Sequence, residues 1–205
     1  MPGKTKLRFM DMLKNGEMVF APCVWDCYSA KAAELSGFKA VLLAGTPAAA
    51  ALTGTPDLGI MTADELIYLT ERVAAFSPLP VLVDFDEGYG DSPLNTYRNV
   101  SRLVQAGCQG FTLDDGMGIR GWSRLAAVKP GEHPYELVSR EQFAAKIRAA
   151  LKAIEGTDTV LIARTEVRCN EGFDEAIYRM KMAEDLGAHM TMINKVCGIE
   201  EARYV

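Results

Sequence analysis

The chain has 205 residues, of which 49% are hydrophobic and 24% charged, and its formal net charge is −5 at pH 7. This length suits a single large domain spanning residues 1–205. The acidic balance argues against nucleic acid as a partner, and no apolar run reaches the roughly 20 residues that a membrane span needs. The amino terminus lacks the apolar core of a secretory signal, and the five dispersed cysteines form no CxxC pair. We therefore expect reduced thiols and a cytoplasmic protein.

One pattern recurs along the chain: a helical stretch, a glycine or proline stop, and then a short apolar run. Six such patterns follow one another, in the segments 14–26, 36–46, 77–88, 106–116, 155–166 and 186–195. The apolar runs are too short for helices and rich in Val, Ile and Leu, which is typical of strands covered on both faces. The glycines before them suit the left-handed residue that often ends a helix. The pattern predicts six strands.

Amphipathic helical patterns lie between these runs, in the segments 26–36, 62–77, 139–154 and 173–187. Thr62 with Glu65, and Ser139 with Gln142, have the spacing of a capping box, in which two side chains satisfy backbone N–H groups at the start of a helix. Ser29 is placed to help cap the first of these helices. Strands alternating with helices indicate an α/β protein with a parallel sheet, which is either open or closed into a barrel.

Polar residues at the carboxyl ends of the strands distinguish an open sheet from one closed into a barrel. Nearly every predicted strand ends in them: Asp26, Gly45 with Thr46, Asp84 with Asp86, Asp114, Arg164 with Glu166, and Asn194 with Lys195. A barrel builds its site from many strands at one rim, whereas an open sheet gathers ligand groups at one switch point. We therefore predict a (β/α)8 TIM barrel. Such barrels have eight strands, so we expect one truncated after about six βα units, or a shortened variant that needs a partner.

The acidic strand end VDFDEGYG carries the strongest chemical signal. Asp84 and Asp86 are two apart on a strand, so both side chains point to the same face, and Asp114 ends the next strand at the same rim. Carboxylates brought this close repel one another unless a positive charge neutralises them. Oxygen donors without His or Cys favour Mg²⁺ or Mn²⁺ over zinc. The alternative is that these aspartates cap helices or pair with Arg and Lys neighbours.

Other rim residues suit an anionic substrate. Arg164 is predicted to clamp a substrate carboxylate, with neutralisation of the acids as the alternative, and Glu166 could orient Arg164 or transfer a proton. Backbone N–H groups of Gly45 and Thr46 could hold a carboxylate, or the pair could form a simple turn. Of the two histidines, His189 is expected to be structural.

The motifs APCVWDCYSA, LLAGTPAAAALTGTPDLG, PVLVDFDEGYG, AGCQGFTLDD, LVSREQFAAKIRAA and IARTEVRCNEGFDEAIYR resemble the phosphoenolpyruvate mutase/isocitrate lyase superfamily over nearly the whole chain. The resemblance implies a barrel of the phosphoenolpyruvate/pyruvate type and a Mg²⁺-dependent enzyme that acts on small 2-oxo or 2-hydroxy carboxylates through an enolate. It implies a homodimer or homotetramer. It also implies a set of roles: metal binding by Asp84, Asp86 and Asp114, a supporting part for Asp57, and substrate binding by Arg164, Gly45, Thr46 and Trp25.

The segment 116–137 departs from that family. It lacks the Lys-Lys/Arg-Cys-Gly-His core of the carbon–carbon lyases and the Lys-Thr-Asn-Ser loop of the mutases. Candidates to supply a proton or close on the substrate are Arg120, Arg124, Lys129, His133 and Tyr135. The first hypothesis is a lyase that cleaves a C–C bond, as isocitrate and methylisocitrate lyases do. The alternatives are a P–C bond enzyme of the phosphoenolpyruvate mutase or phosphonopyruvate hydrolase type, and a catalytically silent carboxylate-binding relative.

Overall fold

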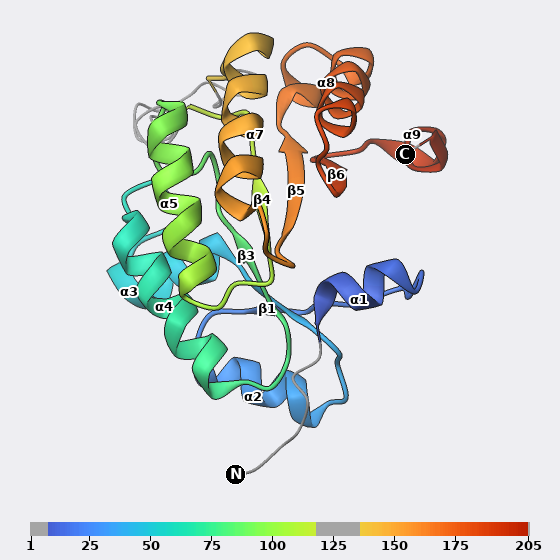
Figure 1. Cartoon of the computed structure of the whole chain (residues 1–205). Coiled ribbons are helices and arrows are strands. Elements are labelled where there is room, and N and C mark those ends of the chain that lie inside the picture. The colour runs from blue at the N-terminus through green and yellow to red at the C-terminus, as the bar shows by residue number, and fades with distance from the viewer. Residues whose placement is uncertain (1–7, 118–135, 205) are drawn as a thin grey trace.

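The computed structural model describes residues 8–117 and 136–204, which form one parallel sheet with helices packed along it (Figure 1). Its six strands pair in chain order: β1 (Cys23–Val24), β2 (Val41–Leu43), β3 (Val81–Asp84), β4 (Gly110–Leu113), β5 (Val160–Thr165) and β6 (Met190–Ile193). Each strand falls in one of the six segments predicted from the sequence. Sequential order with parallel pairing is the arrangement of consecutive βα units in a barrel, so the predicted fold class is confirmed.

Helices and the 3-10 turn η1 connect successive strands, and a further helix lies before the first strand and another after the last. They are α1 (Phe9–Lys14), α2 (Cys27–Leu35), α3 (Gly45–Thr53), α4 (Ala63–Phe76), α5 (Pro93–Gln105), α7 (Arg140–Ile154), η1 (Val167–Cys169), α8 (Phe173–Asp185) and α9 (Gly198–Tyr204). Both predicted capping boxes are present, at Thr62 and at Ser139. In α2 the N-cap is Asp26, whose carboxylate accepts from the backbone N–H of Ser29. Asp26 is therefore engaged in holding a helix start.

Two apolar clusters hold the sheet in place. The larger one lies between the strands and helices α4, α5 and α7, and the outward-facing Val83, Phe85 and Phe111 are fully buried in it. The smaller one joins α1 to the inner face of the strands through Phe9, which packs near Gly110. Since Gly110 begins β4, α1 lies at the amino ends of the strands, away from the rim where the acids gather.

Strands β1 and β6 stand at the two ends of the sheet. Across the described ranges each of them pairs with one neighbour, and Met190 and Met192 of β6 are exposed. The predicted eight-stranded barrel is thus represented by six units. In the same ranges, every helix is too short or too polar to cross a membrane.

Candidate active site at the carboxyl ends of the strands

Arg164 and the acids of two neighbouring strands form one cluster at the rim. Arg164, on β5, donates from Nη1 to Asp84 Oδ1 at 2.6 Å and from Nη2 to Asp114 Oδ2 at 2.5 Å. Its Nη2 also lies 3.6 Å from Asp86 Oδ1, and its Nε lies 3.3 Å from Glu166 Oε1. The structure therefore brings together the three aspartates, the arginine and the glutamate that the sequence singled out. Their predicted roles in binding metal and substrate stay predictions.

The alternation of side chains along the strands explains this convergence. Asp84, Thr112 and Arg164 lie on the inner face of adjacent strands, and Thr112 donates from Oγ1 to Asp84 Oδ1 at 2.9 Å. Asp86 lies beyond the end of β3, in a turn where its φ is 47°. Such a left-handed conformation is uncommon outside glycine and is held here by the surrounding turn. The turn brings Asp86 back towards the inner face.

Burial and charge act against each other at Arg164. Burial alone would lower the pKa of its guanidinium, but the carboxylates of Asp114, Asp84, Asp86 and Glu166 outweigh that effect and hold its pKa above the usual value. Arg164 is thus a permanent cation in the rim. In this arrangement it neutralises the acids, which is the alternative that the sequence left open for it.

Glu166 is held in a second set of contacts. Asn194, which follows β6, donates from Nδ2 to both Glu166 oxygens at 2.7 and 2.8 Å. Burial raises the pKa of the Glu166 carboxyl, against the opposing effects of Arg164 and Asn194. A buried carboxyl with a raised pKa, oriented beside an arginine, is a suitable group to hold or release a proton.

The rim fits a hard divalent cation in its ligand chemistry. Both hydrogen bonds to Asp84 reach Oδ1, whereas its Oδ2 and Asp86 Oδ2 lie 3.4 and 3.6 Å from the position that a Cβ on Gly45 would take. The missing side chain of Gly45 therefore leaves space that two carboxylate oxygens border. Oxygen ligands of this kind suit Mg²⁺ or Mn²⁺.

The charge balance points in the same direction. The buried charged side chains of the described residues are five carboxylates, those of Asp86, Glu87, Asp114, Asp115 and Glu166, and three cations, those of Lys146, Arg164 and Arg179; the partly buried Asp84 adds a sixth carboxylate. Within these described residues, no three His, Cys, Asp or Glu side chains converge closely enough to hold a metal ion as they stand. The guanidinium of Arg164 joins Asp84 to Asp114 instead, so a metal would have to share or replace its contacts.

Gly45 and Thr46 open helix α3 directly after β2. The alternative left open for this pair, a simple strand-to-loop turn, is wrong, because the chain passes from strand to helix there. Backbone N–H groups in the first turn of a helix point towards its start and favour an anion. Thr46 also donates from Oγ1 to Asp57 Oδ2 at 3.0 Å, which ties Asp57 to this helix start. The predicted carboxylate cradle therefore has suitable backbone geometry.

Other candidates lie at the edge of this region or outside it. Trp25 follows β1 and is 43% exposed, and its backbone N–H donates to Ser29. Arg120 and His133 fall outside the residues that the structure describes, as do Arg124, Lys129 and Tyr135.

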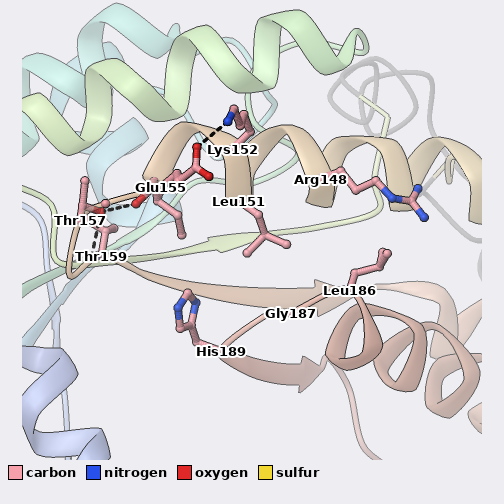
Figure 2. Close-up of a pocket in the computed structure, with 11 residues that line it drawn as sticks. Arg148, Leu151, Lys152, Glu155, Thr157, Thr159, Leu186, Gly187 and His189 are labelled. Carbon is pink, nitrogen blue, oxygen red and sulfur yellow. Dashed lines mark hydrogen bonds and ion pairs between the residues drawn. The ribbon is translucent and has the colours of Figure 1, made fainter.

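His189 lies at the opposite end of the sheet, just before β6, where its Nδ1 accepts from the backbone N–H of Leu161 at 3.1 Å. Burial lowers the pKa of this imidazole, which suits the neutral ring that such an acceptor requires. His189 lines a cleft of about 500 Å³ together with Leu151 and Thr159. Figure 2 shows these side chains around the cleft. Thr159 precedes β5, so the cleft is separate from the rim. We assign His189 a structural role.

Asp115 and Arg179 were missed in the sequence. Asp115 is fully buried, and its carboxylate accepts from Thr165 Oγ1 at 2.5 Å, from the backbone N–H of Glu166 at 2.9 Å and from Arg179 Nη1 at 3.0 Å. Arg179 also donates to the backbone carbonyl of Val138 at 2.9 Å. These contacts join β4, β5, α8 and the residues that lead into α7. They fix the end of β5, which carries Arg164 and Glu166.

Comparisons with known proteins agree with this fold. The sequence model of the phosphoenolpyruvate phosphomutase family matches residues 9–203. The 2-methylisocitrate lyase of Escherichia coli (strain K12) is 36% identical over 159 residues, which make up 77% of this chain and 51% of that protein. The chain therefore spans about half the length of this curated relative.

Two solved structures also align with nearly all of the chain. The crystal structure of 2,3-dimethylmalate lyase, a PEP mutase/isocitrate lyase superfamily member, has a TM-score of 0.84 and 30% identity and covers 95% of this chain and 65% of its own. Phosphonopyruvate hydrolase in complex with oxalate and Mg²⁺ has a TM-score of 0.81 and 25% identity, with the same two coverages. The chain belongs to the phosphoenolpyruvate phosphomutase family, within the PEP mutase/isocitrate lyase superfamily.

Proposed function

We propose that the rim binds Mg²⁺ or Mn²⁺ through Asp84, Asp86 and Asp114 and acts on a small 2-oxo or 2-hydroxy carboxylate, cleaving a C–C bond through an enolate. The observation that carries the proposal is the convergence of these acids on Arg164 beside the open start of α3. The similarity to 2-methylisocitrate lyase supports the C–C lyase assignment, and the neighbour that binds oxalate and Mg²⁺ supports the ligand class.

Each rim residue has a distinct part in this proposal. A bound divalent cation would polarise the substrate oxygens and stabilise the enolate charge. Thr112 holds Asp84 in its orientation, and Asp115 holds the end of β5. Arg164 binds the substrate carboxylate once a cation neutralises the acids in its place. Glu166, which is held in position by Asn194, carries the proton nearest to that carboxylate.

A second candidate is a P–C bond enzyme, either a mutase or a hydrolase. The family match and the similarity to phosphonopyruvate hydrolase favour it, as does the absence of cysteine from segment 116–137. The same cation and arginine would then stabilise an enolate formed by loss of a phosphoryl group. The two candidates share the rim and differ in the bond that breaks.

One set of assays distinguishes the candidates. The protein is incubated with Mg²⁺ and, separately, with 2-methylisocitrate-type acids, oxaloacetate or phosphonopyruvate, and products are followed by pyruvate or glyoxylate release and by phosphorus NMR. Release of a 2-oxo acid without phosphate supports the lyase, and phosphorus transfer supports the alternative. Turnover of none of these, with Mg²⁺-dependent oxalate binding retained, supports the silent carboxylate binder.

The metal assignment has its own variant pair. Asp84→Asn keeps the shape of the side chain and removes its charge, so we expect Mg²⁺-dependent oxalate binding to weaken by at least about a hundredfold. Asp158→Asn is the matched control, because Asp158 is exposed and pairs only with Arg8 among the described residues. Calorimetric titration measures both. Equal oxalate affinity in the two variants would exclude Asp84 from the site.

A further inference from the structure

The turn that follows β3, formed by residues 85–90, carries a rim acid in an uncommon backbone conformation. Asp86 has a φ of 47°, and Tyr89, three residues further on, has a φ of 57°. Residues other than glycine seldom adopt such left-handed values, and each one persists only where surrounding contacts hold it. The position of Asp86 in the rim therefore depends on the groups that hold this turn.

Asn99 of α5 binds one side of the turn. Its Nδ2 donates to the backbone carbonyl of Gly88 at 3.1 Å and to that of Tyr89 at 3.2 Å. Asn99 is 6% exposed, so both hydrogen bonds are shielded from water. One side-chain amide thus satisfies two consecutive carbonyls and fixes the orientation of the two peptide units that flank Tyr89.

The other side of the turn is tied to the strands. The backbone N–H of Asp114 donates to the carbonyl of Asp86 at 2.8 Å, and the N–H of Gly88 donates to the carbonyl of Phe85 at 2.9 Å. Phe85 is fully buried, and its ring lies 5.3 Å from that of Tyr89 between centroids. The turn is therefore held between the end of β4 and the helix α5.

Close packing places α5 directly against the turn. A Cβ on Gly90 would lie 2.7 Å from Asn95 Nδ2, and a Cβ on Gly88 would lie 3.5 Å from Thr96 Oγ1. Asn95, Thr96 and Asn99 follow one another within about one turn of the helix. A change at Asn99 therefore acts on the turn itself and not through an intervening layer of side chains.

We propose that Asn99 is a positioning residue of the rim, which holds the turn in the conformation that presents the Asp86 carboxylate to a divalent cation. This inference rests on the proposed function. The amide of Asn99 contacts the backbone of the turn and acts on the cation through Asp86. Without these two hydrogen bonds the turn can relax, and only the fraction of molecules that keeps the left-handed conformation binds the cation with full affinity.

The test is Asn99→Leu, which keeps the approximate size of the side chain, removes both donated hydrogen bonds and adds no charge. Calorimetric titrations measure Mg²⁺ alone and then oxalate at saturating Mg²⁺. We expect the dissociation constant for Mg²⁺ to rise about tenfold, because the strain of one left-handed residue is enough to shift the population of the turn by that order. Oxalate affinity at saturating Mg²⁺ should stay within about twofold of that of the parent chain, because the bound cation then holds Asp86 in place.

Leu103→Ala is the matched control, because Leu103 lies one turn further along α5 and is fully buried. Removing its side chain should cost at least as much stability to urea as Asn99→Leu does, while both amide hydrogen bonds remain. Its dissociation constant for Mg²⁺ should stay within about twofold of that of the parent chain. If Asn99→Leu does not fold, Asn99→Ala removes the same donors with a smaller side chain and carries the same expectation. Circular dichroism confirms that each variant is folded.

Amide hydrogen exchange gives a second readout, which needs no metal. The backbone N–H of Gly88 reports on the turn, and the N–H of Gln109, which donates to the carbonyl of Val81 at 2.9 Å, reports on the amino ends of the strands. In Asn99→Leu, exchange at Gly88 should accelerate by about tenfold more than exchange at Gln109. In Leu103→Ala the two amides should change by the same factor within about twofold.

The outcomes separate this inference from the proposed function. Weaker Mg²⁺ binding and faster exchange at Gly88 in Asn99→Leu, both absent from Leu103→Ala, support the inference. The absence of either effect in Asn99→Leu, or an equal loss of Mg²⁺ affinity in Leu103→Ala, overturns it and leaves the proposed function intact. If the parent chain itself binds no Mg²⁺, the proposed function fails, and this inference fails with it.

Discussion

Replacing Asp115 by alanine would leave the guanidinium of Arg179 buried without the carboxylate that it contacts at 3.0 Å. Arg179 is 3% exposed, and among the residues that the structure describes it would keep its contacts with Glu175 and the Val138 carbonyl. The backbone N–H of Glu166 and the hydroxyl of Thr165 would lose their acceptor in the same step. Breaking a buried ion pair by removing one partner costs about 3–5 kcal/mol. We expect Asp115→Ala to lower the free energy of unfolding by about that amount.

Arg179→Met should cost less, about 1–3 kcal/mol, because the Asp115 carboxylate would keep two of its three donors. The double variant should then cost less than the two single variants together, by about 1–3 kcal/mol, since the unpaired buried charge is absent from it. Urea unfolding of the four chains, followed by circular dichroism, gives this coupling energy. Strict additivity, or a loss below about 1 kcal/mol in Asp115→Ala, would refute the reasoning.

Three further predictions concern the rim. Arg164→Met leaves Asp84 and Asp114 without their shared cation. Added Mg²⁺ should therefore raise the melting temperature of this variant more than that of the parent chain. Equal increases in the two melting temperatures, measured by calorimetry, would contradict this. The folded-state pKa of the Glu166 carboxyl is raised above 4.5. The free energy of unfolding of the parent chain, relative to that of Glu166→Gln, should therefore increase as the pH falls through the folded-state pKa, with no further increase below about pH 4.5. Urea unfolding of both chains across this range measures the difference. Gly45→Ala places a methyl group beside the two carboxylate oxygens, so oxalate binding should weaken by about tenfold while stability to urea changes by less than about 1 kcal/mol; unchanged oxalate binding would show that the space is not used.

Local patterns predicted the strands, the rim acids and the helix starts. The side-chain period of two places Asp84 on the inner face and Val83 on the outer one, and parallel βα units bring the carboxyl ends of all strands to one rim. The capping boxes at Thr62 and Ser139 depend on residues three positions apart. These features need no knowledge of distant contacts, and the sequence is therefore sufficient for them.

Features that depend on distant partners were not predictable in this way. Asp115 follows Asp114 and looks like a fourth rim acid, yet its carboxylate meets Arg179, 64 residues further along the chain. Lys146 lies on the apolar face of α7 beside Phe143 and Ile147, where an amphipathic pattern would place an apolar residue. Helix α3 was missed because its alanine-rich sequence has no polar face to give a periodic signal. For Asp115 the deciding neighbour, Arg179, comes from another βα unit.

The position of Arg164 shows why the sequence left its role open. As a neutraliser it must bind Asp84 and Asp114, and as a clamp it must bind a substrate carboxylate, and the structure shows the first arrangement. A divalent cation at the same oxygens would make the guanidinium unnecessary there, because both satisfy the same negative charge. On the proposed function, metal binding therefore prepares the clamp, and the energy spent in displacing Arg164 is recovered when it binds the substrate. The two alternatives for Arg164 would then be two states of one site. Arg164 would contact the acids when no cation is bound to them, and the substrate carboxylate when one is.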